Sequence, residues 1–480
     1  MATSKKDMRR IDLVIPWADQ TPKKKEDMAS TYSNDHIAHG GYVYAKQFYS
    51  FFIPPPSPAN KGFRVDTLEQ IANYFVDFPL SSSAFGELGR RTQILEKWIR
   101  LSSISRDTVL STSIEKFALS LFPFLRLPHD SRPLSSLLKR PEKGSKGIVI
   151  PVSTSYFRFG CHLVGSIRNV LKSQIPIEIA YAGDLDLPPK YRQFLSSLDS
   201  GIYFVDVTTY FDNDFIGFST GAWAIKPFAV LASRFEQVML MDSDSVLLQR
   251  PEVVFEKHNG FKETGALLFH DRLLFQNAFP ERHAWWEAQM KYSLPSKNFR
   301  LSRVHNEKYA EEGESGMVVV NKSRLAVVMG LLHAAWQNTK EVRDRVTYRM
   351  GYGDKESWWF AFELCNTPYI FEPHYAAILG EIRDTDNIAR VCSFNIAHTD
   401  ENGSLLWFNG SLLKNKALNT TEFWVPKVWM LNGEWEKGQS KSMWSCMKNG
   451  TIMSIQKQTS WILQKSVQEA ERLDLAIAMI

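Results

Sequence analysis

Short apolar runs alternate with amphipathic stretches over the middle of the chain, and this alternation predicts the fold. Apolar runs bounded by glycine or polar residues are typical of buried strands, here at 147–152, 175–181, 202–207, 238–241, 266–269 and 317–320. Helical spacing of apolar residues predicts helices at 161–171, 226–235 and 325–336. Strands that alternate with helices indicate an α/β fold, with a mostly parallel sheet and helices on both faces.

The chain before this region follows a different pattern. Apolar residues keep helical spacing at 68–78, 94–101 and 114–122, which predicts a helical region. The stretch 127–147 is rich in Pro, Ser, Lys and Arg and predicts a linker. We therefore predict four parts: a poorly structured segment (1–60), a helical stem (61–140), the α/β domain (141–425) and a C-terminal tail that packs on that domain (426–480).

Two carboxylates, Asp242 and Asp244, follow the apolar strand 238–241 directly. Ligands of open α/β sheets bind at the carboxyl ends of the strands. Side chains at i and i+2 of an extended chain point the same way, so two like charges would converge unless a cation lies between them. A metal site is one interpretation, and a polar strand end that caps a helix is the other.

Two more residues could belong to such a site. Lys226 begins the helix before the strand, which places it beside the same strand end, where a cation would stabilise a phosphate leaving group. His398 is a candidate third metal ligand, because Mn²⁺ accepts imidazole as well as carboxylate oxygens. A surface lysine and a structural histidine are the alternatives.

Composition and charge exclude some function classes. The 480 residues are 44% hydrophobic and 13% aromatic, as in a globular protein, and the net charge of +5 is too mild and scattered to indicate a nucleic-acid partner. No C-x-x-C pair indicates a zinc site, although one disulfide is possible among the last three of the four cysteines.

The signals for a cellular compartment disagree. The chain contains no stretch of roughly 18–20 apolar residues and no apolar signal core, so that the sequence taken literally predicts a cytosolic protein. Five glycosylation sequons favour a secretory lumen instead, at Asn321, Asn402, Asn409, Asn419 and Asn449. All but Asn321 lie in the last eighty residues.

Several ordered motifs resemble one known family. They are Gly221–Leu231 (Gly-Ala-Trp-Ala-Ile-Lys-Pro-Phe-Ala-Val-Leu), the stretch 235–251 around Asp242-Ser-Asp244, Ile177–Asp184, Thr264–Arg272, Glu314-Ser-Gly316, Gly353–Ser357 and Trp407–Ser411. Together they span about residues 147–416 and resemble the fungal alpha-1,3-mannosyltransferases that extend N- and O-linked mannans. The upstream lysine, the Asp-x-Asp and a late histidine also resemble the wider glycogenin-like retaining transferases.

The resemblance implies a GT-A fold, GDP-mannose as donor, a mannose-containing glycan as acceptor, and Mn²⁺ (or Mg²⁺) as cofactor. Asp242 and Asp244 match the metal-binding positions, and Lys226 matches the lysine near the donor diphosphate. Asp184 and Arg272 end two matched motifs and are expected at the donor site. The glycogenin-like His-x-x-Gly-x-x-Lys-Pro-Trp motif is absent around His398.

The resemblance further implies retention of configuration, which needs either a carboxylate nucleophile or same-face entry of the acceptor. Asp354 matches the acidic position near the sugar, and either Asp354 or Glu356 could act as nucleophile or electrostatic stabiliser. Trp358 and Trp359 could stack on sugars, but core packing is the expectation. Family members are anchored in the Golgi membrane by an N-terminal helix that this sequence does not show, and a Golgi lumenal location is the preferred prediction.

Three rival functions stay open. A hexosyltransferase that uses a UDP-sugar would need the same site, and a catalytically silent subunit of a mannan-synthesising complex would need none. The run 238–246 also fits the Asp-x-Asp signature of haloacid-dehalogenase-type phosphatases. That fold carries its motif on the first strand, whereas here three strand–helix units come first.

Overall fold

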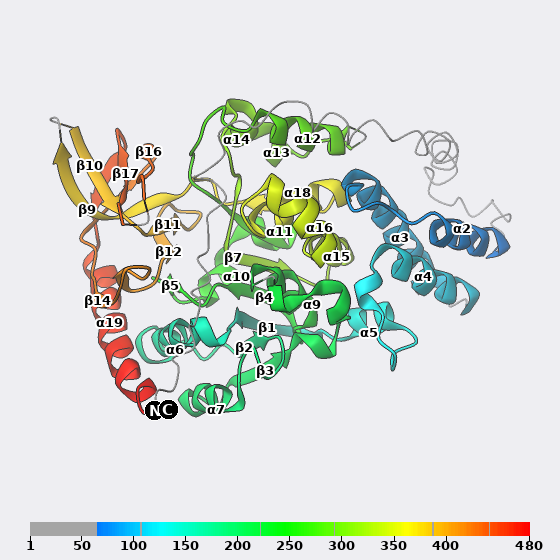
Figure 1. Ribbon diagram of the computed structural model, residues 1–480, viewed down its shortest axis with the longest axis horizontal. Coiled ribbons are helices and arrows are strands. Elements are labelled where there is room, and N and C mark those ends of the chain that lie inside the picture. The colour runs from blue at the N-terminus through cyan, green and yellow to red at the C-terminus, as the bar shows by residue number, and fades with distance from the viewer. Residues whose placement is uncertain (1–64, 106–107, 221, 292, 386–387, 441) are drawn as a thin grey trace, which may run out of the picture. The chain divides into compact units, whose positions relative to one another are not determined.

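A computed structural model describes residues 65–480, apart from 106–107, 221, 292, 386–387 and 441. Val65–Ile480 forms one compact unit (Figure 1). The predicted poorly structured segment 1–60 lies outside the described residues, and the predicted part boundaries stay predictions. No helix of the described part is long and apolar enough to cross a membrane.

The first sheet has the strand order β3-β2-β1-β4-β7-β6-β8, with only β7 antiparallel to its neighbours. Its strands are β1 (Glu142–Pro151), β2 (Ile177–Tyr181), β3 (Ile202–Asp206), β4 (Phe235–Met241), β6 (Ala266–His270), β7 (Gly313–Asn321) and β8 (Ile370–Phe371). The predicted α/β class with a mostly parallel sheet flanked by helices is therefore confirmed. The Asp-x-Asp motif follows the fourth strand along the chain. In the phosphatase fold the motif would follow the first strand, so the strand order does not support the phosphatase interpretation.

Helices cover both faces of this sheet. One face packs against α6 (Phe157–Gly165), the π-helical turn η4 (Ser166–Val170), α7 (Pro189–Leu198), α10 (Glu252–Lys257) and α11 (Asn259–Thr264). The other face contacts α9 (Ile225–Ala232) and α18 (Lys355–Cys365), and α9 and α18 in turn contact α15 (Leu325–Gln337).

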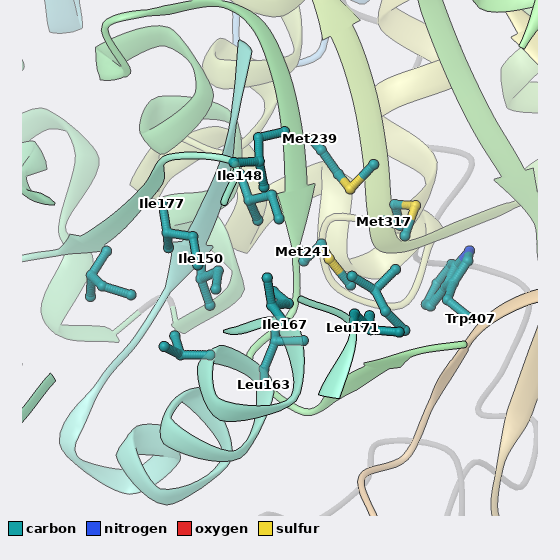
Figure 2. Close-up of a cluster of buried hydrophobic side chains, with 14 of the residues drawn as sticks. Ile148, Ile150, Leu163, Ile167, Leu171, Ile177, Met239, Met241, Met317 and Trp407 are labelled. Atoms are coloured by element: carbon teal, nitrogen blue, oxygen red, sulfur yellow. The ribbon is translucent and has the colours of Figure 1, made fainter. Parts of the chain in front are cut away.

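The core follows the two-residue period of the strands. Ile148 and Ile150 of β1 and Met239 and Met241 of β4 are fully buried in one cluster with α6 (Figure 2). The residues between them, such as Val149 and Leu240, are equally buried and face the opposite layer. Because both faces are buried, the strands read as continuous apolar runs, which is why the sequence revealed them.

The predicted N-terminal helical region is present as α2 (Val65–Asp77), α3 (Phe85–Ser105) and α4 (Thr108–Leu121). Helix α3 packs on α15 and α18, and Gly89 makes this approach possible, since a Cβ there would lie 2.5 Å from the Leu364 carbonyl oxygen. The predicted linker 127–147 is wrong in part. It contains α5 (Pro133–Lys139), which begins on a proline at the first helical position, and the first residues of β1.

The sequence did not reveal a second, antiparallel sheet, ordered β16-β17-β10-β9-β11-β12-β5, with β15 on β9 and β18 on β15. Its strands are β5 (Ser245–Leu247), β9 (Ala377–Thr385), β10 (Ile388–Ser393), β11 (Ile396–Thr399), β12 (Leu405–Asn409), β15 (Val428–Leu431), β16 (Glu434–Glu436), β17 (Ser445–Lys448) and β18 (Thr451–Ser454). A separate hairpin joins β13 (Leu413–Asn415) and β14 (Asn419–Phe423). The final helix α19 (Lys457–Ile477) packs on α6 and η4.

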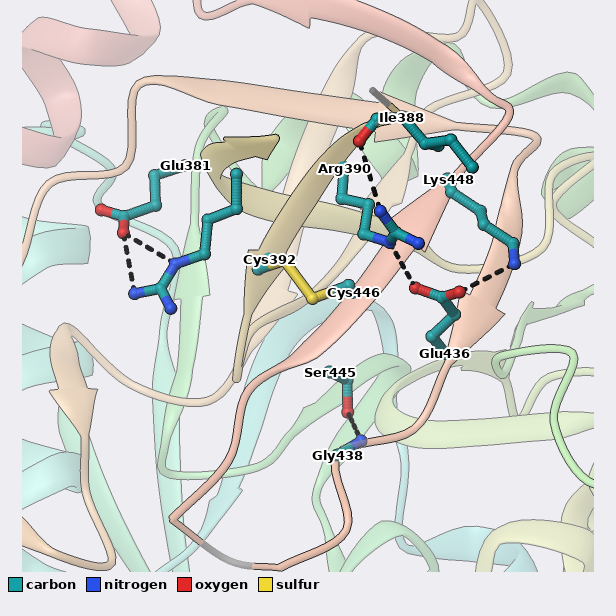
Figure 3. The surroundings of a disulfide bond; sticks show 10 residues. Glu381, Ile388, Arg390, Cys392, Glu436, Gly438, Ser445, Cys446 and Lys448 are labelled. Atoms are coloured by element: carbon teal, nitrogen blue, oxygen red, sulfur yellow. Dashed lines mark hydrogen bonds and ion pairs between the residues drawn. A yellow bond between two sulfur atoms is a disulfide. The ribbon is translucent and has the colours of Figure 1, made fainter. Parts of the chain in front are cut away.

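A disulfide joins Cys392 of β10 to Cys446 of β17, which are direct partners in the sheet (Figure 3). Arg390 and Lys448 flank it, and both pair with Glu436 at 2.8 Å. The other two cysteines, Cys161 and Cys365, are buried thiols. The possible disulfide of the last three cysteines thus takes one definite pairing.

Candidate active site

The Asp-x-Asp turn lies where the two sheets meet. Strand β4 ends at Met241, and the chain passes through Asp242 and Asp244 directly into β5 of the second sheet. The Asp242 amide donates to the Gly316 carbonyl at 2.9 Å, and the Ser245 hydroxyl donates to the same carbonyl at 3.2 Å. The turn is therefore held at the carboxyl edge of the parallel strands, where ligands of such sheets bind.

Lys226 bridges two carboxylates at this edge. Its Nζ lies 2.8 Å from Asp242 Oδ1 and 3.3 Å from Asp354 Oδ1, and it donates to the Ser315 hydroxyl at 3.0 Å. Burial alone would lower the pKa of the ammonium, but Asp242 and Asp354 outweigh burial and raise it above its usual range. The two carboxylates thus favour the charged form of Lys226, which is 4% exposed and lies in the first turn of α9.

The pKa of the Asp242 carboxylate is raised from its usual value. Burial raises its pKa to about 7, and although Lys226 opposes this shift, the charges of Asp244 and Asp354 add to it. Its side chain still keeps 21% of its exposure, so solvent can reach it. A second cation at this position would remove the conflict between the carboxylates and favour the charged form.

Asp244 has its own lysine partner. Lys416, between β13 and β14, forms an ion pair with Asp244 Oδ2, and the Ser411 amide donates to the Asp244 carbonyl at 2.8 Å. Tyr156 lies in the same negative field, because partial burial and the charges of Asp244 and Asp242 raise the pKa of its hydroxyl. Neither Lys416 nor Tyr156 carries a local sequence signal, since each reaches the site through non-local strand pairing.

Asp354 and Glu356 occupy different surroundings at the start of α18. Asp354 is 2% exposed; Oδ1 accepts from the Ser315 hydroxyl at 3.1 Å and Oδ2 from the Trp358 indole at 2.9 Å. Glu356 instead accepts from the backbone amides of Glu312 and Gly313 and from the Trp359 indole.

Their contacts separate the two carboxylates. Burial raises the pKa of Glu356 to about 8, and the charge of Glu311 adds to the shift. The structure brings Asp354, but not Glu356, into contact with Lys226. Trp358 and Trp359 are 1% and 2% exposed, so they are core residues, as expected, and each also holds one of these carboxylates.

Arg272 and His398 belong to a neighbouring charged cluster. Arg272 Nε lies 3.2 Å from Asp271, which also pairs with Lys355, and Lys355 reaches Glu314 at 3.2 Å. Lys355 and Arg272 hold the pKa of Asp271 well below its usual range, although its burial acts the other way. Glu314 precedes Ser315, so this cluster adjoins the Lys226 bridge along β7.

His398 packs its ring on Trp407, with centroids 4.3 Å apart. Burial lowers its pKa to about 4, against the charges of Glu314 and Asp271, and its Nε2 has no hydrogen-bond partner among the described residues. Within the described part of the chain, no three His, Cys, Asp or Glu side chains are grouped closely enough to hold a metal ion. The structure therefore does not gather His398 with Asp242 and Asp244 into a three-ligand set.

Asp184 lies at the same sheet edge but apart from the lysine bridge. It follows β2, its side chain is 71% exposed, and it pairs with Arg192 of α7 at 2.7 Å. Its predicted contact with a donor stays a prediction.

Two exposed aromatic side chains, Trp223 and Tyr352, form a rim beside the Lys226 bridge that the sequence did not indicate. Trp223 and Tyr352 are 39% and 38% exposed, with ring centroids 5.3 Å apart. Gly353 has a φ of 65°, and a Cβ there would lie 3.0 Å from the Trp223 ring, so the close approach of this turn needs a glycine. Because Asp354 is the next residue, the rim adjoins the Lys226 bridge.

The residues present fit a divalent cation that is shared with a substrate. Mg²⁺ and related cations are commonly held by one or two carboxylates, with phosphate oxygens and water completing the shell. Asp242 and Asp244 supply such a pair, and a third protein ligand is not required. Each of these carboxylates also has a lysine partner, Lys226 for Asp242 and Lys416 for Asp244.

The chain is similar to known proteins of one enzyme family. Residues 145–400 match the family described as "Mannosyltransferase putative". Two relatives from Saccharomyces cerevisiae are alpha-1,3-mannosyltransferase MNT2, 28% identical over 56% of this chain and 52% of its own, and alpha-1,3-mannosyltransferase MNN1, 23% identical over 55% and 40%. The chain thus spans about half the length or less of these relatives.

Solved structures of glycosyltransferases are similar only at a low level. The bifunctional glycosyltransferase WbbM has a TM-score of 0.31 and 15% identity, over 48% of this chain and 39% of its own. The galactosyltransferase LgtC, in complex with donor and acceptor sugar analogues, has the same score and identity over 47% and 72%. The family match, in contrast, covers more than half of the 480 residues, and the chain belongs to this mannosyltransferase family.

Proposed function

We propose that the protein is a metal-assisted, retaining mannosyltransferase that moves mannose from GDP-mannose to a mannoside of a glycoprotein glycan, with an alpha-1,3 linkage. The observation that carries the proposal is the Lys226 bridge: a buried cation 2.8 Å from Asp242 and 3.3 Å from Asp354, at the carboxyl edge of the sheet. Membership of the family and the names of the relatives support the sugar and the linkage.

In the proposed reaction the bond between mannose C1 and the diphosphate oxygen breaks, and a bond from the acceptor hydroxyl oxygen to C1 forms. The products are GDP, the extended mannoside and one proton. A divalent cation held by Asp242 and Asp244 would neutralise the diphosphate as it leaves. Lys226 and Lys416 would add positive charge beside the same oxygens, where charge develops in the transition state.

Between the two candidate catalytic carboxylates, the contacts favour Asp354. Both of its oxygens are occupied by hydrogen-bond donors, so electrostatic stabilisation of a cationic sugar and positioning of Lys226 suit it better than nucleophilic attack. Glu356 is bound by backbone amides and an indole away from Lys226. This arrangement supports retention through same-face entry of the acceptor.

A donor screen tests the proposal. The full chain with Mn²⁺ is offered GDP-mannose, UDP-glucose, UDP-galactose or UDP-N-acetylglucosamine, and both donor hydrolysis and transfer to mannobiose are followed. We expect transfer from GDP-mannose alone, lost on addition of EDTA and reduced at least about 100-fold by Asp242→Asn. Asp214→Asn, an exposed aspartate in α8 (Asn213–Ile216), is the matched control.

The outcomes of this screen separate the rival functions. Preference for a UDP donor would replace the proposed substrate and keep the transferase site. Wild-type turnover by Asp242→Asn would remove the Asp-x-Asp from the mechanism. No turnover with any donor, together with rescue of a glycan defect by Asp242→Asn in cells, would favour the silent-subunit function.

A Golgi lumenal location belongs to the same proposal. The Cys392–Cys446 disulfide is typical of an oxidising compartment. Three sequon asparagines, Asn402, Asn419 and Asn449, are exposed and open to glycosylation. Asn409 is only partly exposed and donates to Glu314 at 3.3 Å beside the site, so we do not expect a glycan there.

A further inference from the structure

A cavity of about 350 Å³ opens at the same sheet edge, away from the lysine bridge. It lies at the carboxyl ends of β6 and β8, and its opposite wall comes from the β15–β16 turn and from β16 and β17 of the second sheet. Its volume is within the range of small-molecule sites, about 300–1,000 Å³. Nothing in the chemistry of the Asp242 site requires this cavity.

The cavity and the Asp242 turn share one edge of the first sheet. Strands β4 and β6 are both antiparallel to β7, which lies between them, so their carboxyl ends point the same way. Two strand spacings separate β4 from β6, about 10 Å. Arg272 and Asp271, which directly follow β6, link the two places through Lys355 and Glu314.

The ionisable residues of the cavity wall are paired with other residues of the protein. His270 lies 2.6 Å from Glu312, Glu372 lies 2.8 Å from His258, and Arg303 pairs with Glu307 at 2.7 Å. Each ionisable lining residue thus already contacts a partner within the protein. The cavity therefore suits a neutral ligand, in contrast to the Asp242 turn with its lysines and carboxylates.

The remaining wall combines aromatic rings with neutral polar groups. Trp435, Tyr375 and Phe371 supply apolar surface, and Asn298 and Asn432 supply amide groups. A pyranose has the matching chemistry, with an apolar C–H face and a ring of hydroxyl groups at its edge. Trp435 is fixed by its indole, which donates to the Ala376 carbonyl at 3.1 Å, so its ring is a rigid platform.

We propose that this cavity binds an internal mannose residue of the acceptor oligosaccharide, further along the glycan than the terminal mannose that receives the new sugar. The inference rests on the proposed function for the identity of the sugar. The cavity makes the enzyme selective for acceptors long enough to reach from the Asp242 edge into it, so acceptor length, not only the terminal mannose, determines affinity.

Two readouts with the full chain test this site. Calorimetry measures binding of methyl α-mannoside and of mannobiose to mannotetraose without donor, and transfer kinetics use the same acceptors with GDP-mannose. We expect mannotetraose to bind and to have a KM at least about tenfold below that of methyl α-mannoside. Trp435→Ala should abolish this gain and leave the KM for GDP-mannose and for methyl α-mannoside unchanged.

A second variant covers the case in which Trp435→Ala fails to fold. Leu301 lines the cavity and is 66% exposed, so Leu301→Asp should fold and also weaken mannotetraose binding about tenfold. Leu294→Asp and Trp461→Ala change residues that are 91% and 51% exposed outside the cavity, and serve as matched controls.

Each outcome decides one of the two proposals. Equal affinity for all acceptor lengths, or unchanged mannotetraose binding in the Leu301 variant, overturns the internal-mannose site. Mannotetraose binding that is lost in the variants, without any transfer by the wild type, supports the site and counts against the proposed reaction instead.

Discussion

At the scale of single residues, Lys226 holds the candidate site together. It contacts Asp242, Asp354 and Ser315, which come from three different segments. Without the ammonium, the buried Asp354 carboxylate and the partly exposed Asp242 carboxylate would share no cation between them, and a buried charge that has lost its partner is costly. The lysine therefore serves both the fold of the site and its charge balance.

Lys226→Met keeps the length of the side chain and removes its charge. We expect donor turnover to fall about 100-fold or more, because the cation beside the leaving diphosphate is lost. Lys465→Met, an exposed lysine on α19, is the matched control. Steady-state kinetics with GDP-mannose and thermal unfolding give the readouts. Wild-type turnover by a folded Lys226→Met would show that the bridge is structural only.

The sequence predicted part of this site for a simple geometric reason. Asp242 and Asp244 directly follow one strand, and Lys226 lies at the start of the helix that precedes this strand. Their order along the chain is therefore enough to place all three at the carboxyl edge of the sheet. Asp354 and Glu356 are also two apart, but they begin a helix, where such residues point in different directions. Lys416 could not be found this way, since the β13–β14 hairpin brings it there from far along the chain.

At the scale of elements, a buried histidine of α15 links the N-terminal helices to the α/β domain. His333 of α15 is fully buried; its Nε2 donates to the Phe85 carbonyl of α3 at 3.0 Å, and its Nδ1 accepts from Gln337 at 3.1 Å. The neutral ring thus uses both nitrogens. A proton on Nδ1 would face an amide donor, and burial already lowers the pKa of His333 to about 4.

This environment predicts a stability contribution that depends on pH. The unfolded histidine titrates near 6.5 and the folded one near 4. As the pH falls from 6.5 to 4, the unfolded state therefore takes up the proton first, and about 3 kcal/mol of stability is lost. Above pH 6.5 the contribution is complete. Urea unfolding at pH 7.5 and pH 4.5 measures the change for wild type and for His333→Gln.

The comparison with the variant isolates this group from other residues that titrate over the same range. Asp242 and Glu356 have raised pKa values, so their buried charges become less costly as the pH falls. We expect the stability difference between wild type and His333→Gln to shrink by about 3 kcal/mol from pH 7.5 to 4.5. A difference that is the same at both pH values would contradict the prediction.

Element by element, the sequence predicted the strands buried on both faces better than those of the second sheet. The apolar runs of β4 and β7 are unmistakable, whereas β11 and β16 are short and mix polar with apolar residues. Their pairing depends on contacts distant in sequence, which periodicity does not report. The linker prediction failed because a proline-rich stretch was taken as a break, although Pro133 starts a helix.

At the scale of the whole unit, the two sheets depend on each other. Strand β4 of the first sheet continues directly into β5, which pairs with β12 of the second. Gly316 of β7 binds the turn between them, and a Cβ there would lie 2.8 Å from Trp407 of β12. A substitution that destabilises the second sheet should therefore disturb the Asp242 turn, although both aspartates precede every strand of that sheet.

The disulfide tests this dependence. Cys392 and Cys446 close a loop with a sequence separation of 54, for which loop-closure entropy alone gives about 4 kcal/mol. Cys392→Ser/Cys446→Ser should lower the free energy of unfolding by about that amount and reduce donor turnover together with it.

Because Cys161 and Cys365 are buried thiols, the oxidised wild type should show two titratable thiols after denaturation and four after reduction. Cys161→Ser/Cys365→Ser is a control with the bridge intact. Four thiols without reductant would show that the bridge does not form, and unchanged turnover in a destabilised variant would show that the site does not depend on the second sheet.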